Sequence, residues 1–440
     1  MEPVTMVIVG AGSRGRAYAR YALDHPEQLK IVAVAEPREE YRAYLAEQHN
    51  IRPDRVYRDW RALAECEKLA DTAGICTQDE MHKEPAVALA EKGYHLLLEK
   101  PMAPDPDSCR AIVEAVKTHK VMLSVCHLLR YTVYTMRLKN LLDSGVIGDV
   151  CSIQHLEPVG YWHQAHSFVR GNWANEAASA PMLMTKACHD LDWLRYLAGK
   201  PCQQISSFGR LSHFRKEQKP EGSSDRCLDC RLSETCPYSA QNIYLCNVYQ
   251  PRGGENTQEK LFTEGSVNQW PWDVLTPEPS YETIIEALRT GPYGRCVYAC
   301  DNDVVDHQVV NMQFEGGMTA SFTMTAFTPM TNRKTSVFGS RGMIEGDGRK
   351  LYRYDFLSRT ETVYDTHAFV DSSAAGGHAG GDQAVMKAFI AAVASNDASH
   401  ILSGPDETLE SHQMVFAAER ARRENRVISL LNADEKEAGR

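Results

Sequence analysis

Three glycines near the N-terminus constrain the fold of this chain more than any other feature. They form the pattern Gly10-x-Gly12-x-x-Gly15, which follows an apolar, β-branched run at 5–9 and precedes a helix-like stretch at 16–23. In a dinucleotide-binding loop the first glycine makes a tight turn, the second lets the backbone approach a pyrophosphate, and the third lets helix and strand pack closely. The order of strand, glycine loop and helix therefore predicts a dinucleotide-binding unit.

An acidic residue ends the next predicted strand. Residues 29–35 are mostly apolar, and Glu36 follows them directly. A carboxylate at this position accepts hydrogen bonds from the adenosine ribose and repels a 2′-phosphate, which favours NAD. Arg14 and Arg38 are close enough in sequence to accommodate that phosphate, so NADP stays open. The alternative for Glu36 is a solvated loop acid.

Predicted strands and helices alternate as far as residue 125. Further strands are expected at 55–57, 71–76, 94–98 and 121–125, with helices between them. This alternation is typical of a doubly wound parallel sheet of the Rossmann type, so we expect an α/β fold with a dinucleotide-binding domain at 1–125. In such sheets ligands bind at the carboxyl ends of the strands. Thr77, which follows the fourth strand, lies at that edge.

An ionisable pair follows the fifth predicted strand. Glu99-Lys100-Pro101 comes directly after the apolar run 94–98, and the proline stops the strand. A lysine beside a carboxylate and partly out of water can exchange protons. The alternative is a surface turn with a solvated salt bridge.

Composition excludes several classes of protein. The 440 residues carry a formal net charge of −10 and no Lys/Arg block, which argues against a nucleic-acid partner. No apolar run is long enough to span a membrane, and no secretory signal precedes the first strand. The 13 cysteines are therefore expected to be thiols of a cytoplasmic protein, with a metal site as the main exception.

Together these motifs resemble the glucose–fructose oxidoreductase, inositol dehydrogenase and MocA family (Gfo/Idh/MocA). The resemblance rests on the glycine loop, Glu36, the strand end at Thr77 and Glu99-Lys100-Pro101, and it continues through Arg130, the Ser144–Gly148 turn and His189-Asp190-Leu191-Asp192-Trp193. It implies a nicotinamide cofactor and a second α/β domain, at 126–440, with a large open, mainly antiparallel sheet that serves for homo-oligomerisation. The cofactor-binding residues are then expected to be Gly10, Gly12, Ser13, Arg14, Gly15, Glu36, Arg38, Thr77, Glu99 and Lys100.

The catalytic candidates are Lys100, His189 and Lys186. A histidine with a pKa near neutrality can take a hydroxyl proton as hydride leaves. Lys186 and His189 are three residues apart and share a face if the helix has begun there. The family commonly has an aspartate four residues before this histidine, where this chain has Thr185. Lys186 is therefore expected to take over a substrate-binding role.

Aromatic and polar residues alternate along 161–173. Aromatic rings with interleaved hydrogen-bonding groups suit a sugar, whereas the alternative is a loop packed on the core by its tryptophans. Glycines around His378 suggest another substrate contact. The predicted substrate-binding residues are Arg130, Trp162, His166, Arg170, Trp173, Lys186 and His378.

A cysteine-rich insertion is expected near 209–280. Cys227, Cys230 and Cys236 have the close spacing of a structural zinc site, which would need a fourth ligand from Cys246, Cys296 or Cys300. The alternative is a set of free thiols.

Three functions compete at this stage. The first is an NAD-dependent dehydrogenase that oxidises a secondary hydroxyl of a sugar, glycoside or polyol. The second is an NAD-dependent glycoside hydrolase that oxidises its substrate transiently, eliminates the aglycone, adds water and reduces the product again. The third is a redox sensor that binds the cofactor without catalysis.

Overall fold

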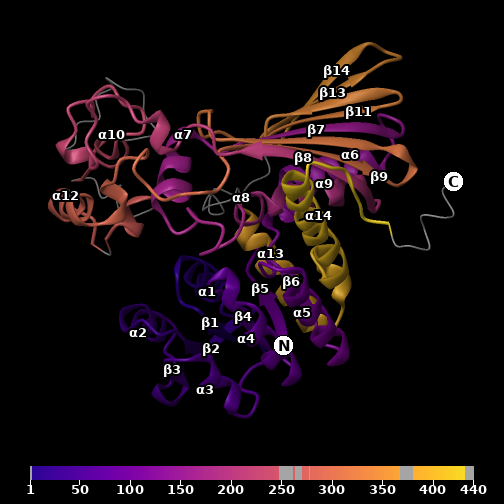
Figure 1. The fold of residues 1–440 in the computed structure, drawn as a ribbon. Coiled ribbons are helices and arrows are strands. Elements are labelled where there is room, and N and C mark those ends of the chain that lie inside the picture. The colour runs from indigo at the N-terminus through magenta and orange to yellow at the C-terminus, as the bar shows by residue number, and fades with distance from the viewer. Residues whose placement is uncertain (1, 247–260, 263–269, 277, 367–379, 432–440) are drawn as a thin grey trace.

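The computed structural model describes residues 2–246, 261–262, 270–276, 278–366 and 380–431. Two sheets with their helices make up most of it (Figure 1). One sheet is parallel and comes from the first 125 residues, and the other is larger and mainly antiparallel. The predicted α/β fold class is confirmed.

The first sheet has six parallel strands in the order β3-β2-β1-β4-β5-β6. Its strands are β1 (Val4–Val9), β2 (Leu29–Ala35), β3 (Val56–Tyr57), β4 (Thr72–Ile75), β5 (His95–Leu98) and β6 (Leu123–Val125). The helices between them are α1 (Ser13–Asp24), α2 (Glu39–Gln48), α3 (Trp60–Glu65), α4 (Lys83–Glu91) and α5 (Pro106–Thr118). All six strands lie where the sequence pattern predicts them.

Alternate residues of β1 are buried in two separate hydrophobic cores, one on each face of the first sheet. Met6 and Ile8 are buried with residues of α1, α2 and the late helix α13 (Gly381–Ser395), whereas Val7 and Val9 are buried with residues of α3, α4 and α5. A strand that is buried on both faces must be apolar throughout, which explains the continuous hydrophobic run. Because α13 covers one of these faces, the C-terminal part of the chain completes the core of the first domain.

The second sheet has nine strands in the order β14-β13-β12-β11-β7-β10-β9-β8-β15. Its strands are β7 (Val150–Pro158), β8 (Cys202–Arg210), β9 (His307–Phe314), β10 (Thr319–Thr325), β11 (Lys334–Gly339), β12 (Gly342–Gly346), β13 (Lys350–Asp355), β14 (Thr360–Asp365) and β15 (Ile428–Ser429). Among the described strands of this sheet, only β7 and β10 pair in parallel. The sequence pattern did not indicate β8 or β14, since their polar residues interrupt the hydrophobic alternation.

Helices cover one face of this sheet and connect it to the first domain. They are α6 (Val133–Asp143), α8 (Met182–Thr185), α9 (Cys188–Ala198) and α14 (Pro405–Glu424). The long helix α14 contacts β8 and α9 on one side and α5 on the other, and Figure 1 shows it running from one domain to the other. The two domains are therefore joined by packed helices as well as by the polypeptide chain that passes from one to the other.

A fourth hydrophobic cluster organises the insertion, at the left of Figure 1. It packs α10 (Ala240–Tyr244) and α12 (Tyr281–Thr290) against α7 (Tyr161–His163) and the π-helix η4 (Gln164–Arg170). The aromatic stretch 161–173 is thus largely helical.

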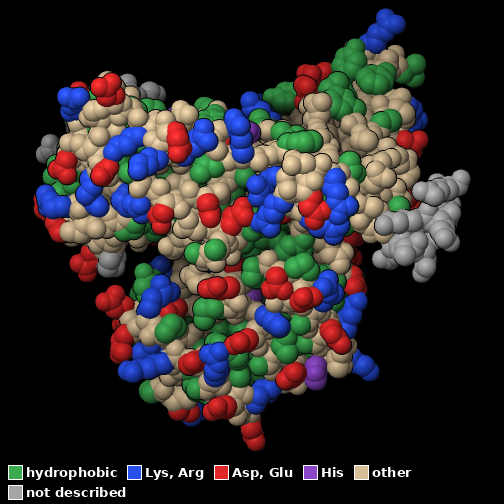
Figure 2. All heavy atoms as spheres, in the orientation of Figure 1, with side chains coloured by type: hydrophobic (Ala, Val, Ile, Leu, Met, Phe, Trp, Pro, Cys, Tyr) green, Lys and Arg blue, Asp and Glu red, His purple; other side chains and the backbone are tan. Residues whose placement is uncertain are grey.

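None of the described helices is both long and apolar enough to cross a bilayer. On the face shown in Figure 2, acidic and basic side chains are interspersed. That face carries no large patch of a single charge.

Candidate functional site

The loop between β1 and α1 has the tight backbone packing that its glycines predict. A Cβ on Gly10, whose φ is +92°, would lie 2.5 Å from the carbonyl oxygen of Cys76. A Cβ on Gly15 would lie 2.0 Å from the carbonyl oxygen of Gly10. A Cβ on Gly12 would meet only the Arg38 Nη2 atom, at 3.5 Å, so the backbone stays approachable there. Since Ser13 begins α1 directly afterwards, this loop fits a dinucleotide pyrophosphate at a helix N-terminus.

Glu36 lies at the end of β2, beside this loop. Its Oε2 atom accepts a hydrogen bond from the Ala11 backbone N–H at 2.8 Å, and its Oε1 atom accepts one from Arg38 Nε at 2.8 Å. Burial opposes ionisation of Glu36, but the hydrogen bonds from Arg38 outweigh it and lower the pKa. Arg38 also lies 4.0 Å above the Tyr41 ring. The carboxylate and the guanidinium are therefore both at the expected ribose position.

Glu99 holds the loop that presents Lys100. Its Oε1 atom accepts hydrogen bonds from Arg14 Nε at 2.7 Å and from the Tyr18 hydroxyl at 2.5 Å, and its Oε2 atom accepts one from the Lys100 backbone N–H at 2.8 Å. Burial raises the pKa of Glu99, but the charges of Arg14 and Lys100 outweigh it and lower the pKa. Arg14 also pairs with Asp382 of α13. Arg14 and Glu99, both expected to bind cofactor, thus fix the loop to α1 and α13.

Lys100 links the two domains. Its Nζ donates a hydrogen bond to the carbonyl oxygen of Thr185, at 2.9 Å, on the segment that carries the other catalytic candidates. Asp79 lies nearby: burial raises its pKa, and the charges of Lys100 and His82 oppose that rise. Sequence reasoning missed Asp79. Because it follows Thr77 by two residues at the same strand end, the rule that selected Thr77 would also have found it.

The segment that carries Lys186 and His189 is interrupted between two helices. α8 ends at Thr185 and α9 begins at Cys188. The helix has therefore not begun at Lys186, and the expected helical face shared with His189 does not form. Lys186 Nζ instead pairs with Glu157 Oε1 at 3.1 Å.

A network of charges extends from Lys186. Glu157 also pairs with Arg333 Nε at 3.0 Å, and Arg333 pairs with the fully buried Asp190. His155 Nε2 lies 3.0 Å from Asp190 Oδ1. These pairs fix the end of β7 against the start of α9. No sequence motif indicates Glu157 or Arg333, since the network joins distant parts of the chain.

His189 is 7% exposed and lies against a second histidine. Its ring contacts His127 edge to face, with the centroids 5.5 Å apart and the rings inclined by 81°. Burial lowers the pKa of His127 to about 3, so His127 is neutral at physiological pH. Sequence reasoning missed His127. It lies two residues beyond β6, at the same sheet edge as Lys100.

Arg130, predicted to bind substrate, is buried in an ion pair within the protein. It is 2% exposed, and its Nε and Nη2 atoms each donate to a carboxylate oxygen of Asp192 at 2.7 Å. Its Nη1 atom donates to the carbonyl oxygen of Leu402. This geometry favours a structural role, because three of the five guanidinium N–H donors are held by buried partners within the protein.

The predicted residues of the aromatic stretch mostly pack inside the insertion. The rings of Trp162 and Trp270 are 5.0 Å apart, and His166 Nδ1 lies 2.7 Å from the Tyr244 hydroxyl. Burial lowers the pKa of His166 to about 3. Trp173 is 37% exposed. Packing, the alternative weighed for this stretch, accounts for Trp162 and His166. The predicted contact at 378 lies outside the described residues.

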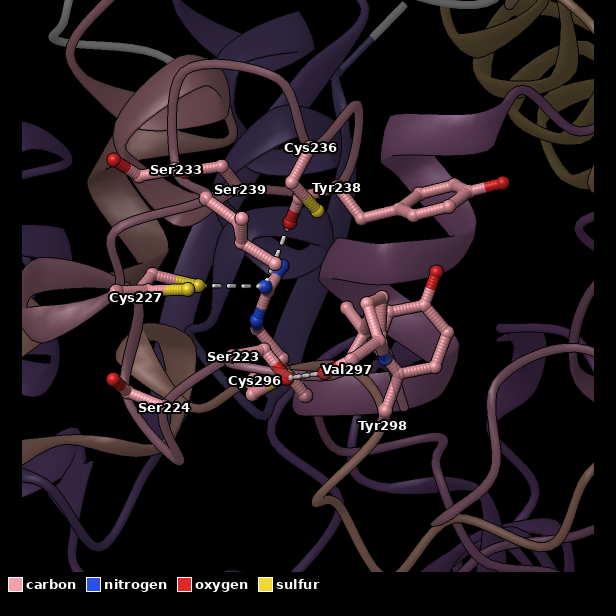
Figure 3. Close-up of a pocket in the computed structure, with 14 residues that line it drawn as sticks. Ser223, Ser224, Cys227, Ser233, Cys236, Tyr238, Ser239, Cys296, Val297 and Tyr298 are labelled. Atoms are coloured by element: carbon pink, nitrogen blue, oxygen red, sulfur yellow. Dashed lines mark hydrogen bonds between the residues drawn. The ribbon is translucent and has the colours of Figure 1, made fainter. Parts of the chain in front are cut away.

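Arg170 lines a cavity in the insertion. Figure 3 shows Cys227, Cys236 and Cys296 around the same cavity. The Nη2 atom of Arg170 donates to Cys227 Sγ at 3.5 Å and to the Tyr238 carbonyl oxygen at 2.8 Å, and its Nε atom donates to the Arg295 carbonyl oxygen at 2.7 Å. Arg170 therefore holds the insertion together. The cavity beside it is lined by four of the candidate zinc ligands, Cys227, Cys230, Cys236 and Cys296.

The zinc prediction is not supported. Within the described part of the chain, which includes every cysteine, no group of three or more His, Cys, Asp or Glu side chains is placed to hold a metal ion. Cys300 Sγ instead donates to the Cys296 carbonyl oxygen, and Cys246 is exposed. All 13 cysteines are free thiols, the alternative considered from the sequence.

Comparison with protein families covers nearly the whole chain. Residues 4–127 match the model of the oxidoreductase family with an NAD-binding Rossmann fold, and residues 139–430 match the C-terminal alpha/beta domain of the same family. The chain belongs to the Gfo/Idh/MocA oxidoreductase family. This oxidoreductase thus has the NAD-binding domain that its glycine loop predicts.

Curated relatives of this oxidoreductase include sugar-related enzymes. The putative oxidoreductase YteT of Bacillus subtilis is 20% identical over 328 residues, which cover 72% of this chain and 71% of that protein. Levoglucosan dehydrogenase of Pseudarthrobacter phenanthrenivorans is 25% identical over 209 residues, or 46% of this chain and 52% of that protein.

Solved structures share the whole fold. A levoglucosan dehydrogenase complex with NADH and L-sorbose superimposes with a TM-score of 0.68 at 17% identity, covering 98% of this chain and 100% of that one. An Agrobacterium radiobacter oxidoreductase in complex with NAD+, L-tartaric acid and magnesium gives a TM-score of 0.66 at 13% identity, covering 97% and 98%.

Proposed function

We propose that this oxidoreductase oxidises a secondary hydroxyl of a sugar, glycoside or polyol, with NAD as the hydride acceptor. The observation that carries the proposal is the hydrogen bond from Lys100 to Thr185, which joins the cofactor loop to the segment bearing His189. The relatives that bear the names levoglucosan dehydrogenase and D-glucoside 3-dehydrogenase support a carbohydrate substrate.

The protein's part in this reaction is to position the hydroxyl and move its proton. Bound NAD supplies the acceptor for the hydride. Lys100 donates a hydrogen bond to the reacting oxygen, and its bond to the Thr185 carbonyl orients its ammonium group. His189 takes the hydroxyl proton. Lys186, neutralised by Glu157, binds a substrate hydroxyl at the rim.

Redox-neutral cleavage or hydration of a glycoside is the second candidate. His163 is the residue that bears on it, because this additional imidazole lies within electrostatic reach of Lys186 and Lys100. Burial is the main cause that lowers its pKa well below the usual range, so its ring is neutral at physiological pH and accepts a proton only weakly. Relatives named 2,7-anhydro-N-acetylneuraminate hydratase support this alternative.

One experiment separates these reactions. The purified protein is incubated with NAD and a panel of sugars, polyols and aryl glycosides, while absorbance at the NADH wavelength and release of the aglycone are both followed. Accumulation of NADH supports the dehydrogenase, and aglycone release without net NADH supports the hydrolase. Lys100→Met is expected to abolish either signal, whereas the exposed Lys117→Met serves as the matched control. A protein that binds NADH but shows neither signal would favour the sensor.

The remaining parts of the proposal concern cofactor choice, assembly and location. Arg38 keeps NADP open, and comparing the dissociation constants of NADH and NADPH tests that choice.

Exposed apolar side chains on the second sheet, Phe208 and Val363 among them, support a homo-oligomer. Light scattering on the purified protein tests it. Free thiols throughout the chain support a cytoplasmic location, which fractionation of the source cells tests.

A further inference from the structure

A buried histidine behind the proposed base has an unusual environment. The His127 side chain is 0% exposed, and neither of its ring nitrogens has a hydrogen-bond partner. A neutral imidazole carries one N–H donor and one acceptor, and burying both without partners destabilises a protein. A structural requirement alone does not explain this residue, because an apolar ring of similar shape would avoid that cost.

The neighbouring His412 provides an internal comparison. It is also fully buried, and its ring lies 5.6 Å from that of His127. However, both of its nitrogens are bonded: Nε2 accepts from the Met102 backbone N–H at 2.9 Å, and Nδ1 lies 2.8 Å from the Thr408 carbonyl oxygen. His412 therefore has the bonding of a structural histidine, and His127 does not.

The ring of His127 lies against both the proposed base and a buried carboxylate of α9. It contacts the ring of His189. Its Nδ1 atom is 3.6 Å from Asp192 Oδ2, just beyond hydrogen-bonding distance. Arg130 and Ser411 hold this carboxylate in place. A small movement of His127 would therefore complete a bond to Asp192 without moving the carboxylate.

We propose that His127 is a positioning residue, which orients the His189 ring and bonds to Asp192 when His189 takes the proton of the reacting hydroxyl. The inference rests on the proposed dehydrogenase function. In this step the proton moves from the hydroxyl to His189 and the hydride goes to NAD, while His127 neither gains nor loses a proton. When the His127 N–H bonds to Asp192, the carboxylate polarises the His127 ring. The polarised ring then stabilises the positive charge of the imidazolium that forms on His189. The charged and titratable groups that face His127 are His189 and Asp192 of α9, Arg130 of η3 (Leu128–Tyr131), His412 of α14 and Lys100 of the loop after β5.

His127→Phe tests this role, because phenylalanine keeps an aromatic ring and removes both nitrogens. We expect the affinity for NADH and the melting temperature to be retained, since no satisfied hydrogen bond is lost. We expect kcat on the substrate found in the panel to fall roughly 10-fold or more. We also expect the acid limb of the kcat/KM profile to move to lower pH, because the imidazolium of His189 loses stabilisation.

Two further variants sharpen the result. His127→Asn keeps a side-chain N–H that can reach Asp192, so it should recover part of the lost kcat. His95→Gln is the matched control, since His95 is a half-buried histidine at the opposite end of β5 that accepts from the Met122 backbone N–H. Wild-type kcat and an unchanged pH profile in His127→Phe, with only its melting temperature altered, would overturn the proposal.

An NMR titration separates this inference from the proposed function. The His189 ring nitrogens are followed against pH in the wild type and in His127→Phe, with NADH bound and no substrate needed. A midpoint that moves to lower pH in the variant supports the coupling even if no carbohydrate is oxidised. An unchanged midpoint refutes the coupling even if the dehydrogenase function is correct.

Discussion

Gly12→Ala offers a direct test of the cofactor cradle, because the structure separates the effect of this change on binding from its effect on folding. Gly12 has a φ of −66°, which an alanine adopts without strain. Its added Cβ would meet only the flexible end of the Arg38 side chain, at 3.5 Å. We therefore expect a melting temperature close to that of the wild type.

The added methyl group should nevertheless weaken cofactor binding. It would stand where the backbone must approach the pyrophosphate, and so lengthen hydrogen bonds to a charged group. Each such bond contributes about 1.5–3 kcal/mol. Loss of one corresponds to an increase in the dissociation constant of roughly 10- to 100-fold. Titration of the protein with NADH, followed by nicotinamide fluorescence, measures this change.

Gly15→Ala is the contrasting variant. Its Cβ would lie 2.0 Å from the Gly10 carbonyl oxygen, so the turn itself must move. Such overpacking lowers the free energy of unfolding by about 1–3 kcal/mol or more. The melting temperature should therefore fall along with the affinity for NADH. If Gly12→Ala bound NADH as tightly as the wild type, or lost as much stability as Gly15→Ala, the assignment of Gly12 to the pyrophosphate would be refuted.

Three other perturbations test the rest of the site. Arg130→Met leaves Asp192 buried without its ion pair and should cost about 3–5 kcal/mol in chemical denaturation, whereas Arg61→Met breaks only exposed pairs and should change stability by less than about 1 kcal/mol. Acid should destabilise the fold from pH 6.5 downward, because burial lowers the pKa of His127 and of His166 to about 3 and the unfolded chain binds protons that the folded chain excludes. Each of these histidines contributes about 1.4 kcal/mol per pH unit, so denaturation curves at pH 7, 6 and 5 should be less steeply pH-dependent in His127→Phe. Lys186→Met should raise KM for the carbohydrate more than it lowers kcat, and equal losses in both would argue for a catalytic lysine.

The sequence by itself determined the first domain and its cofactor loop. These features depend on short-range physics: the alternation of apolar runs with helices, the glycines at 10 and 15 that no side chain could replace, and the proline after Lys100. Each of the six strands of the first sheet could therefore be located from the residue pattern alone. The strand-end rule also selects the edge where Lys100, Thr77 and Glu36 lie, and applied to every strand it would have added Asp79 and His127.

Only the tertiary structure decided what the distant polar residues do. Arg130 and Arg170 were expected to bind substrate, and in the structure part of their donors bond to partners within the protein, such as Asp192 and the Arg295 carbonyl oxygen. The pairing of Lys186 with Glu157, and the position of His127 behind His189, likewise join segments that are far apart in sequence. A motif specifies which side chains are available. Whether a buried charge faces a ligand or a partner depends on which desolvated groups the folded chain brings within hydrogen-bonding distance.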